Sequence, residues 1–382
     1  MQKPDFAKNQ EKILFQYRER KEYILKIAYG FEDLASELEL LLSGKADNPQ
    51  EKNPCVKLCL LCDSNTKKLI LPSLKKALSP FFPRLHVLSF PAGEEQKNQK
   101  TLNRIYRFLL KNNFSRGDCI LSLGGGTVGD IGGFAAATYL RGLSHIQIPS
   151  TLLAMTDASL GGKTGIDYCG FKNMIGAFYM PSLVYINIKL LFSLPEREFA
   201  SGMAEVLKHA LIASASQYRF ILSKRKEIRA REPSVLYDML QKSIETKKKI
   251  VESDPLEKGE RALLNFGHTL GHAIEKESAF SLRHGEAVAL GMLAAMQISV
   301  KRGYLNQNEL EEFRTLLQSL NLPVFFEALD IDHICESTWK DKKRAGEQIR
   351  FILLKKIGEA FIDRKVDLLQ MKEALDSIYG KK

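Results

Sequence analysis

Short apolar segments alternate with amphipathic stretches through the first half of the chain, an order that few folds accommodate. Residues 56–63 (VKLCLLCD) are predicted to form a strand, and a helix is expected in 66–78. A second strand is predicted at 85–91, followed by apolar residues at helical spacing over 98–113. The run 118–126 (DCILSLGGG) is a predicted strand that ends in glycines. This alternation predicts a parallel sheet in an α/β domain.

The pattern changes near residue 193. Pro195 stands close to a predicted helix start, where its fixed φ is favourable, and long helical segments follow to about residue 320. We therefore predict an α/β domain over 1–193, in which 1–40 forms an N-terminal extension and the first elements, and an all-α domain over 194–382. The segment 41–54 is predicted to be a surface loop.

Composition is that of a globular two-domain protein. The 382 residues are 45% hydrophobic and 26% charged, and no apolar run reaches the roughly 18–20 residues that cross a bilayer. The N-terminal stretch is charged throughout and lacks the apolar core of a signal peptide. The cysteines of 55–63 have no second paired cluster with which to bind zinc, so reduced thiols are expected. These features lead us to expect a cytoplasmic protein without a membrane partner.

The net charge of +11 suggests nucleic-acid binding as one interpretation. The basic residues, however, are spread along helix faces such as 223–232 (SKRKEIRARE) rather than gathered in one patch. We therefore expect no nucleic-acid partner. A pocket for a small molecule with several negative charges also needs lysine and arginine, and this interpretation is the more informative one.

A glycine-rich stretch follows the third predicted strand. GGGTVGD contains G-x-G-x-x-G as Gly124, Gly126 and Gly129, a spacing that lets the backbone approach a pyrophosphate at a helix start. The next strand lacks the acidic residue that usually binds the ribose, so we favour a dinucleotide loop of non-standard layout over a plain tight turn. LGGKTG (160–165) resembles the end of a P-loop, but Asp157 occupies the place of its first glycine, which argues against a kinase or ATPase.

Three of the seven histidines lie close together in the sequence. His268 and His272 share a predicted helix face, and His284 opens the next helix. Thr269 stands where a zinc protease of the HExxH type has glutamate, so protease chemistry is not predicted. With Glu205 as a carboxylate, two imidazoles make a divalent site that leaves room for substrate oxygens. Structural histidines are the alternative interpretation.

Several longer motifs occur in a fixed order. They are GGGTVGDIGGFAAATYLRG, IPSTLLAMTDASLGGKTGID, GFKNMIGAFYMPSLVYIN, GMAEVLKHALI, RALLNFGHTLGHAIE and HGEAVALGM. Through these motifs the chain resembles, from about residue 56 to 363, the 3-dehydroquinate synthase family of the sugar-phosphate cyclase superfamily. The resemblance implies a homodimer. Its α/β domain would bind NAD, its helical domain would hold one zinc or cobalt ion, and the active site would lie between them.

The resemblance also implies a reaction. The family converts 3-deoxy-arabino-heptulosonate 7-phosphate, a small-molecule sugar phosphate, into 3-dehydroquinate and phosphate, within the shikimate pathway of aromatic biosynthesis. NAD is recycled rather than consumed, because the substrate is oxidised, loses phosphate, is reduced again and closes its ring by an aldol step.

Residue-by-residue matching to the family's motifs implies the site. The metal ligands match Glu205, His268 and His284, and the catalytic positions match Glu257, His272 and Lys163. The substrate positions match Arg141, Asp157, Lys163, Asn173, Lys208, Lys247, Arg261, Asn265 and, chosen over Lys342, Lys343. The cofactor positions match Asp63, Asn65, Glu94, Lys97, Gly125, Gly126, Gly129, Asp130, Ser150, Thr151 and Lys172. In the family, the arginine at position 141 reaches the phosphate across the dimer interface.

Residue chemistry favours this family over its neighbours. A substrate with a phosphate and a carboxylate carries close to three negative charges, and matching donors are supplied by Lys163, Lys208, Lys247, Arg141 and Arg261. Cyclases of sedoheptulose phosphate or glucose phosphate have no need for the basic pair Lys247 and Arg261, and metal-dependent polyol dehydrogenases need no phosphate-binding lysines. One position departs from the family's motifs, and one alternative metal ligand stays open. Asp254-Pro255 replaces the family's usual Asp-Glu, and His209 is an alternative metal ligand.

Overall fold

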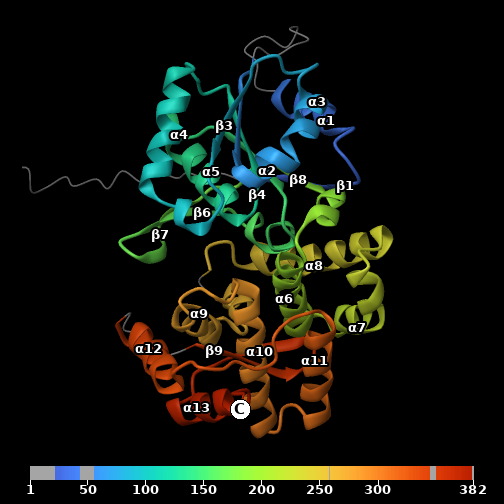
Figure 1. Cartoon of the computed structure of the whole chain (residues 1–382), viewed down its shortest axis with the longest axis vertical. Helices are drawn as coiled ribbons and strands as arrows, with labels where there is room; N and C mark the ends of the chain where they lie inside the picture. Colours follow the sequence, from blue (N-terminus) through green and yellow to red (C-terminus); the bar gives the residue numbers. More distant parts are fainter. Residues whose placement is uncertain (1–21, 44–55, 258, 345–349, 381–382) are drawn as a thin grey trace, which may run out of the picture.

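The computed structural model describes residues 22–43, 56–257, 259–344 and 350–380, apart from the side chains of 340–344. Figure 1 shows an α/β half, built from the first part of the chain, stacked on a helical half. The predicted boundary at 193/194 falls between the last strand of the sheet and the first long helix. Within the described residues, no helix combines the length and the apolar character needed to span a bilayer.

The α/β half contains a six-stranded sheet whose paired strands are all parallel, which confirms the prediction. Its order is β1-β8-β5-β4-β2-β3. β3 pairs on one side of β2 and β4 on the other, so the order reverses between β2 and β4. Ligands of such sheets bind at the carboxyl ends of the strands beside this reversal. The strands are β1 (Ile24–Ala28), β2 (Leu58–Asp63), β3 (Leu85–Phe90), β4 (Cys119–Gly124), β5 (Ser144–Pro149) and β8 (Leu183–Asn187).

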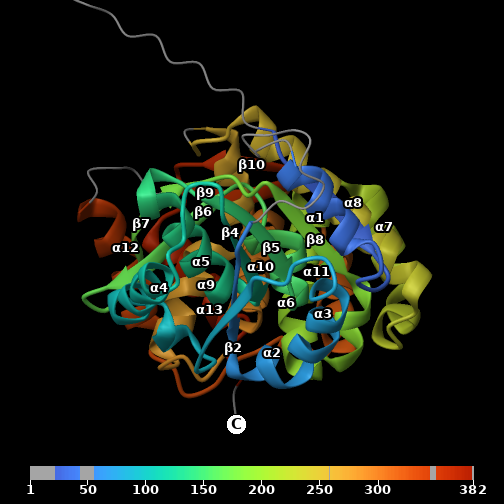
Figure 2. The ribbon, with the colours of Figure 1, turned by 90° about the horizontal axis from the view of Figure 1, so that it is seen from above.

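Helices cover both faces of the sheet (Figure 2). Successive residues of β2 therefore belong to two separate cores, with Leu60 in one and Leu61 in the other. Burial on both faces explains why this strand is a continuous apolar run. Beside the sheet, the first core includes residues of α1 (Leu34–Ser43) and α3 (Leu71–Leu78), and it continues into the helical half. The second core includes residues of α4 (Gln99–Lys111) and α5 (Gly126–Thr138), while the short α2 (Ser64–Leu69) contributes to neither core.

A hairpin leaves the sheet after β5. A π-helical turn, η3 (Ala154–Ala158), precedes β6 (Lys163–Tyr168) and β7 (Phe171–Phe178), which pair antiparallel. Figure 1 shows β7 projecting from the side of the α/β half. Short 3-10 turns complete the chain at η1 (Glu94–Gln96), η2 (Tyr139–Arg141), η4 (Ile188–Ser193) and η5 (Glu260–Asn265).

The second half is helical, as predicted, but it is not all α. β9 (Phe351–Lys356) and β10 (Glu359–Asp363) form an antiparallel hairpin, which corrects the all-α prediction. Periodicity cannot distinguish the short buried run of β9 from a helix segment. Gly358 in the turn has a φ of +87°, and its N–H donates to Leu211 O. The helices are α6 (Glu196–Ala213), α7 (Ala215–Arg229), α8 (Pro233–Ser253), α9 (His268–Glu277), α10 (His284–Lys301), α11 (Gln307–Ser319), α12 (Ile331–Arg344) and α13 (Leu368–Asp376).

Glycines let the helices of this half approach one another closely. A Cβ on Gly285 of α10 would lie 1.9 Å from the carbonyl oxygen of Ser201 in α6. A Cβ on Gly291 would lie 2.0 Å from the carbonyl oxygen of Gly267, just before α9. Backbone contact therefore fixes α10 against α6 and α9, the three helices that carry the predicted metal ligands.

Candidate active site

The G-x-G-x-x-G sequence joins β4 to α5, the strand–turn–helix setting that a dinucleotide loop requires. β4 ends at Gly124, and Gly125 immediately precedes α5. Gly129 packs on β5, where an added Cβ would lie 2.8 Å from Gln147 Oε1. The close approach of α5 to the sheet thus favours glycine at this position.

Other predicted cofactor positions lie at the same end of the sheet. Asp63 is the last residue of β2, where its carboxylate caps α2, and Asn65 lies in the first turn of that helix. Ser150 and Thr151 follow β5, and the Ser150 N–H donates to Gly124 O at 2.8 Å. The carboxyl ends of β2, β4 and β5 therefore bring these residues to one edge, beside the reversal of strand order.

A buried lysine joins further cofactor positions. Lys97 Nζ lies 2.5 Å from Asp130 Oδ2 and 3.8 Å from Glu94 Oε1, and it donates to Asn173 Oδ1 at 2.5 Å. Burial lowers the pKa of Lys97, but the two carboxylates outweigh it and the net pKa is raised. Burial raises the pKa of Asp130, and Lys97 offsets this only in part. Asn173, a predicted substrate position, thus adjoins the predicted cofactor positions.

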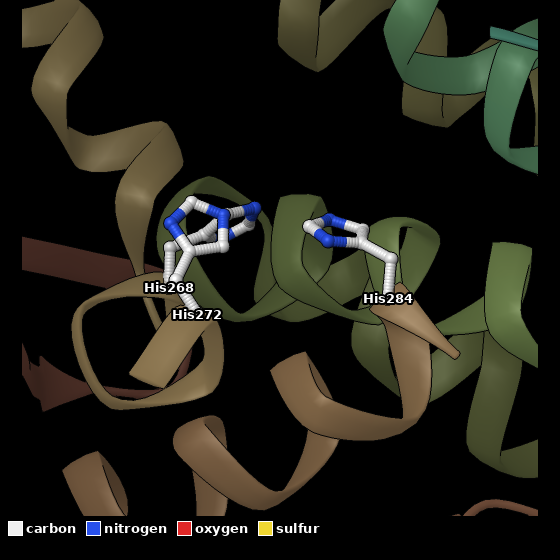
Figure 3. Close-up of side chains that lie close together, drawn as sticks. All are labelled: His268, His272 and His284. Carbon is white, nitrogen blue, oxygen red and sulfur yellow. The ribbon is translucent and has the colours of Figure 1, made fainter. Parts of the chain in front are cut away.

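Three imidazoles gather where α9 meets α10 (Figure 3). The ring centroids of His268 and His272 are 5.1 Å apart, and the His284 ring lies 5.3 Å from the first and 5.7 Å from the second. One nitrogen of each ring lies within 4.8 Å of the other two, which is close enough to share a metal ion.

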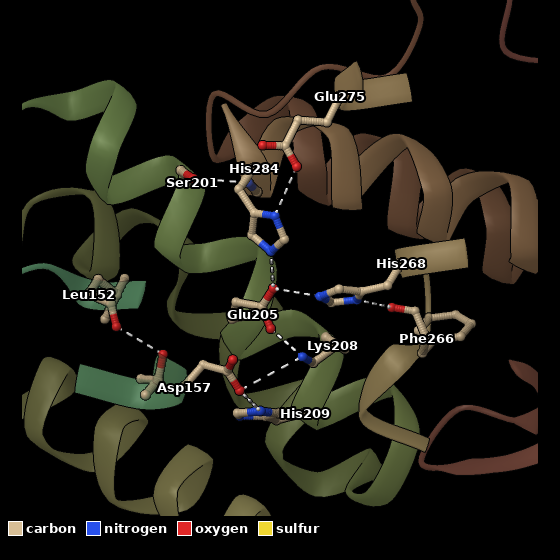
Figure 4. A network of polar contacts seen from close by, with 12 residues as sticks. Leu152, Asp157, Ser201, Glu205, Lys208, His209, Phe266, His268, Glu275 and His284 are labelled. Atoms are coloured by element: carbon tan, nitrogen blue, oxygen red, sulfur yellow. Dashed lines mark hydrogen bonds and ion pairs between the residues drawn. The ribbon is translucent and has the colours of Figure 1, made fainter. Parts of the chain in front are cut away.

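Glu205 of α6 lies against two of these rings (Figure 4). Its Oε1 is 3.5 Å from His268 Nε2 and 3.4 Å from His284 Nε2, while Oε2 contacts Lys208 Nζ. Glu205 is fully buried, yet Oε1 accepts no hydrogen bond of normal geometry. An unsatisfied buried carboxylate oxygen that faces two imidazole nitrogens fits a divalent cation.

The second nitrogen of each of these two rings faces an acceptor. His268 Nδ1 lies 3.2 Å from Phe266 O, and His284 Nδ1 lies 3.3 Å from Glu275 Oε2. A proton on Nδ1 would leave the lone pair of Nε2 directed at Glu205, as in metal-binding histidines. The residues that hold the rings thus present one nitrogen of each to a common point.

Electrostatics at this centre favour a bound cation. Burial raises the pKa of Glu205, but Lys208, His268 and His284 together outweigh it and the net pKa falls well below the usual range. Burial lowers the pKa of His284, but the contacts with Glu205 and Glu275 more than compensate and raise it to about 9. Positive charge between the two carboxylates is therefore favourable, whether a proton or a metal ion supplies it.

A second group of buried charges adjoins Glu205. Lys247 Nζ, from α8, lies 2.6 Å from Asp157 Oδ1 and donates to Asp157 O at 2.5 Å. Lys208 Nζ lies 3.9 Å from the same Oδ1. Burial raises the pKa of Asp157, but the two lysines outweigh it and hold the pKa well below its usual range. The α/β half and the helical half thus meet through oppositely charged side chains, Asp157 from the first and the two buried lysines from the second.

His209, the alternative ligand, belongs to this second group. Its Nε2 lies 3.5 Å from Asp157 Oδ1, and its Nδ1 lies 2.8 Å from Ser243 Oγ. Asp157, Glu205 and His209 offer ligand atoms within 4.8 Å of one another. Lys208 and Lys247 already supply the positive charge there, so a cation is less favourable than between the other histidines.

The loop between α8 and α9 carries three more predicted positions. Glu257 Oε2 forms an ion pair with Lys163 Nζ of β6, and Asn265 Nδ2 donates to Glu257 Oε1 at 3.5 Å. Arg261 is only 1% exposed and donates to Pro255 O at 2.6 Å and to Gly161 O at 3.2 Å, while its Nε has no partner. Pro255, the departure from the family pattern, therefore helps to hold Arg261 through its carbonyl oxygen.

Three predicted positions stand apart from this group. Arg141 is exposed in η2 with a φ of +66°, and in the described part of the chain no hydrogen bond or ion pair joins it to the other predicted site residues. Lys172 Nζ donates to Glu275 Oε1 at 2.8 Å instead of contacting the other cofactor positions. Lys343 belongs to α12, and its side chain lies outside the described part.

Glu275 is the site residue that sequence reasoning missed. It lies in α9, three residues after His272, and contacts both His284 and Lys172. An acidic residue on a short amphipathic helix is ordinary, so the sequence offered no signal that this one is buried. A motif comparison that also covers the residues hydrogen-bonded to the metal ligands could have pointed to Glu275.

Two solved structures have a fold similar to that of this chain. ValA, a 2-epi-5-epi-valiolone synthase from Streptomyces hygroscopicus subsp. jinggangensis 5008 with NAD+ and Zn2+ bound, has a TM-score of 0.84 at 24% identity, covering 96% of this chain and 99% of that chain. A 2-deoxy-scyllo-inosose synthase complexed with carbaglucose-6-phosphate, NAD+ and Co2+ has a TM-score of 0.78 at 24% identity, covering 92% and 96%. The chain shares its fold with these two synthases.

Sequence comparison identifies the family. Models of the N-terminal and C-terminal parts of 3-dehydroquinate synthase match residues 87–201 and 202–344. The 3-dehydroquinate synthase of Acetivibrio thermocellus is 42% identical over 304 residues, which cover 79% of this chain and 84% of that protein. The chain belongs to the 3-dehydroquinate synthase family, and the resemblance found in its motifs is confirmed.

Proposed function

We propose that the chain is a lyase that converts 3-deoxy-arabino-heptulosonate 7-phosphate into 3-dehydroquinate and phosphate, a step of the shikimate pathway. The observation that carries the proposal is the buried carboxylate of Glu205, which faces two imidazoles at Oε1 and Lys208 at Oε2. Identity of 42% to a 3-dehydroquinate synthase supports the same activity.

NAD and one divalent ion, zinc or cobalt, fit the residues present. The unsatisfied Oε1 of Glu205 supports a metal held by Glu205, His268 and His284. The glycine loop at the carboxyl edge of the sheet supports NAD binding there. When bound, NAD exchanges a hydride with the substrate, and the ion acts as a Lewis acid toward substrate oxygens.

Buried cations suit a substrate that has an anionic group at each end. Lys208, Lys247 and Arg261 are 2%, 5% and 1% exposed, so each can form charge-assisted hydrogen bonds away from water. Fixing both ends of the substrate fixes the reacting carbon between them. In this proposal, Lys247 and Arg261 serve the carboxylate, and Lys163 is assigned with Arg141 to the other anionic end.

Two residues are assigned to proton transfer. Burial lowers the pKa of His272 to about 4, so its ring is neutral at physiological pH and can accept a proton beside the substrate phosphate. Glu257 is assigned to the proton relay because its motif matches that position of the family. Its ion pair with Lys163 of the opposite half supports a place beside the substrate.

Two alternatives share this architecture. Another sugar-phosphate cyclase would act on a substrate without a carboxylate, and a polyol dehydrogenase would act on one without phosphate. Neither needs the buried basic pair Lys247 and Arg261, whose presence supports the proposed substrate.

We also propose a homodimer in the cytoplasm. A reducing compartment suits the five described cysteines, which form no disulfide among the described residues. A dimer would explain how the exposed Arg141, which stands apart from the rest of the site, reaches substrate in a second copy.

A substrate panel tests the proposed function. Purified protein with NAD and zinc is given heptulosonate phosphate, sedoheptulose phosphate, glucose phosphate and, in a separate reaction, glycerol. Phosphate release only from heptulosonate phosphate is expected. Release from either of the other two sugar phosphates would favour another cyclase, and net NADH from glycerol would favour a polyol dehydrogenase.

A further inference from the structure

A buried carboxylate that has no assigned role stands behind the candidate metal centre. Glu275 of α9 is 7% exposed, and each of its two oxygens has its own partner. Oε2 lies 3.3 Å from His284 Nδ1, on the side of the ring opposite the nitrogen that faces Glu205 (Figure 4). Oε1 accepts a hydrogen bond from Lys172 Nζ at 2.8 Å.

The contact with Glu275 is suited to fix His284. A carboxylate that accepts a hydrogen bond from Nδ1–H sets both the tautomer and the orientation of the imidazole, and it makes Nε2 a stronger metal ligand. His268 has only a backbone carbonyl, Phe266 O, in the corresponding place. His284 is also the first residue of α10, where few intrahelical contacts restrain a side chain. Glu275 supplies that restraint.

Lys172 in turn fixes Glu275. Its Nζ also lies 4.7 Å from the centroid of the Phe280 ring, in the loop between α9 and α10. Lys172 belongs to β7, so the lysine reaches from the hairpin of the α/β half to the helical half. With both oxygens engaged, the Glu275 carboxylate cannot rotate without losing one of its partners.

We infer that Glu275 is a positioning residue that orients His284 for the metal ion, and that Lys172 holds Glu275 in place from the α/β half. The inference rests on the proposed function, in which Glu205, His268 and His284 hold the ion. It adds that metal affinity depends on a contact between the two halves of the molecule.

The test measures zinc Kd on the purified, metal-free full chain by competition with a chelator. Glu275→Ala is expected to raise zinc Kd about 10–100-fold, the usual effect of removing such a partner. Glu275→Gln keeps the side-chain volume, but it has only one oxygen to accept from both His284 and Lys172. This variant is therefore also expected to bind zinc more weakly. It decides the question if the alanine variant fails to fold.

A matched control separates positioning from general destabilisation. Asp363 is another buried carboxylate of the helical half, held by Arg302 at 2.6 Å, so Asp363→Asn should lower the melting temperature and leave zinc Kd unchanged. The absorption spectrum of the cobalt-loaded protein should change in the Glu275 variants and stay unchanged in Asp363→Asn, because it reports ligand geometry.

Lys172→Met tests the second part of the inference. Loss of the ammonium group frees one oxygen of Glu275, so zinc Kd should rise, but by less than in Glu275→Ala. An unchanged zinc Kd in Lys172→Met would overturn the role of Lys172.

The outcomes distinguish this inference from the proposed function. Suppose that both Glu275 variants keep the zinc Kd and the cobalt spectrum of the wild type, while His268→Ala loses zinc. This result would overturn the inference about Glu275 and leave the proposed function intact. Zinc retained in His268→Ala would overturn the proposed metal site, and the inference with it.

Discussion

At the scale of single residues, one buried carboxylate organises the candidate site. A carboxylate withdrawn from water is costly unless positive charge surrounds it. Glu205 receives part of that charge from Lys208 at Oε2 and faces two imidazoles at Oε1. A divalent ion would complete the set, since it satisfies the oxygen that has no other donor.

Removing ligands should separate the roles of the histidines. Glu205→Ala and His268→Ala are expected to lose bound zinc, whereas His272→Ala should keep it and lose most of its phosphate-releasing activity. Metal analysis of the purified variants checks this, with about one ion per wild-type chain as the reference. A metal-free His272→Ala protein would instead indicate a site of three histidines, which also lie close enough to share an ion.

Removing one buried cation should weaken substrate recognition. Lys247→Met deletes the charged hydrogen bonds of a lysine that is 5% exposed, and each such bond contributes about 1.5–3 kcal/mol. We expect kcat/KM for heptulosonate phosphate to fall about 10–100-fold, as steady-state kinetics would show.

The neighbouring lysine provides the control for this experiment. Lys248 lies on the same helix with a side chain that is 63% exposed, so Lys248→Met should leave kcat/KM unchanged. Equal losses in the two variants would contradict the assignment of Lys247 to the substrate.

Residue chemistry and family motifs suffice to predict which side chains meet, but not how they are held. The ligand set and its lysines lie in runs such as GMAEVLKHALI, which are specific enough to match residue by residue. Glu275 ends another of these runs, RALLNFGHTLGHAIE, but the match implied no role for it, because its partners His284 and Lys172 come from other elements. Only the fold makes those contacts, so the second layer of the site escapes sequence reasoning.

At the scale of elements, close helix packing positions the ligands. α10 approaches the start of α9 so nearly that Gly291 has no room for a side chain. An added methyl group must push the two helices apart, and with them His268 and His284. The geometry of the metal centre therefore depends on a residue that contacts no metal.

Gly291→Ala should damage both stability and metal binding. Overpacking of this kind costs about 1–3 kcal/mol, which thermal or urea unfolding would register as a lower midpoint. Zinc Kd should rise as well, because the ligand-bearing helices separate.

Gly117→Ala serves as the comparison. A Cβ at Gly117 meets no atom within 4 Å, so that variant should keep both its unfolding midpoint and its zinc Kd. A Gly291→Ala protein as stable as Gly117→Ala would show that α9 and α10 can separate at no cost.

Element type could be predicted best where the sequence pattern is long. The parallel sheet follows from strands separated by helices, because only crossovers of that length connect parallel neighbours. The β9–β10 hairpin could not be predicted in this way, because its buried strand is a short apolar run between predicted helices. Tertiary packing on α6 decides its conformation, as the hydrogen bond from Gly358 to Leu211 indicates.

At the scale of the whole molecule, ion pairs join the two halves across the site. Lys163 meets Glu257, Asp157 meets Lys247, and Lys172 meets Glu275. Each pair between the halves thus contains at least one residue predicted to bind substrate or cofactor. Substrate anions would replace part of these pairs, so binding and the relative placement of the halves are coupled.

A dimer in which Arg141 serves the partner's site predicts complementation. Arg141→Ala and His268→Ala should each be inactive alone. In a mixture that exchanges subunits freely, half of the dimers would be mixed, each with one intact site. Activity should then recover to about a quarter of the wild-type value. An inactive mixture, in a preparation shown to contain mixed dimers, would mean that Arg141 acts within its own chain.

The central claim is that the site oxidises its substrate only transiently in order to expel phosphate. The most direct measurement follows phosphate release and NADH absorbance together, with heptulosonate phosphate in large excess over NAD. The account predicts many equivalents of phosphate for each NAD, with no net NADH. Three results would contradict the account. They are phosphate release limited to one equivalent per NAD, NADH that accumulates in step with phosphate, and no phosphate release at all.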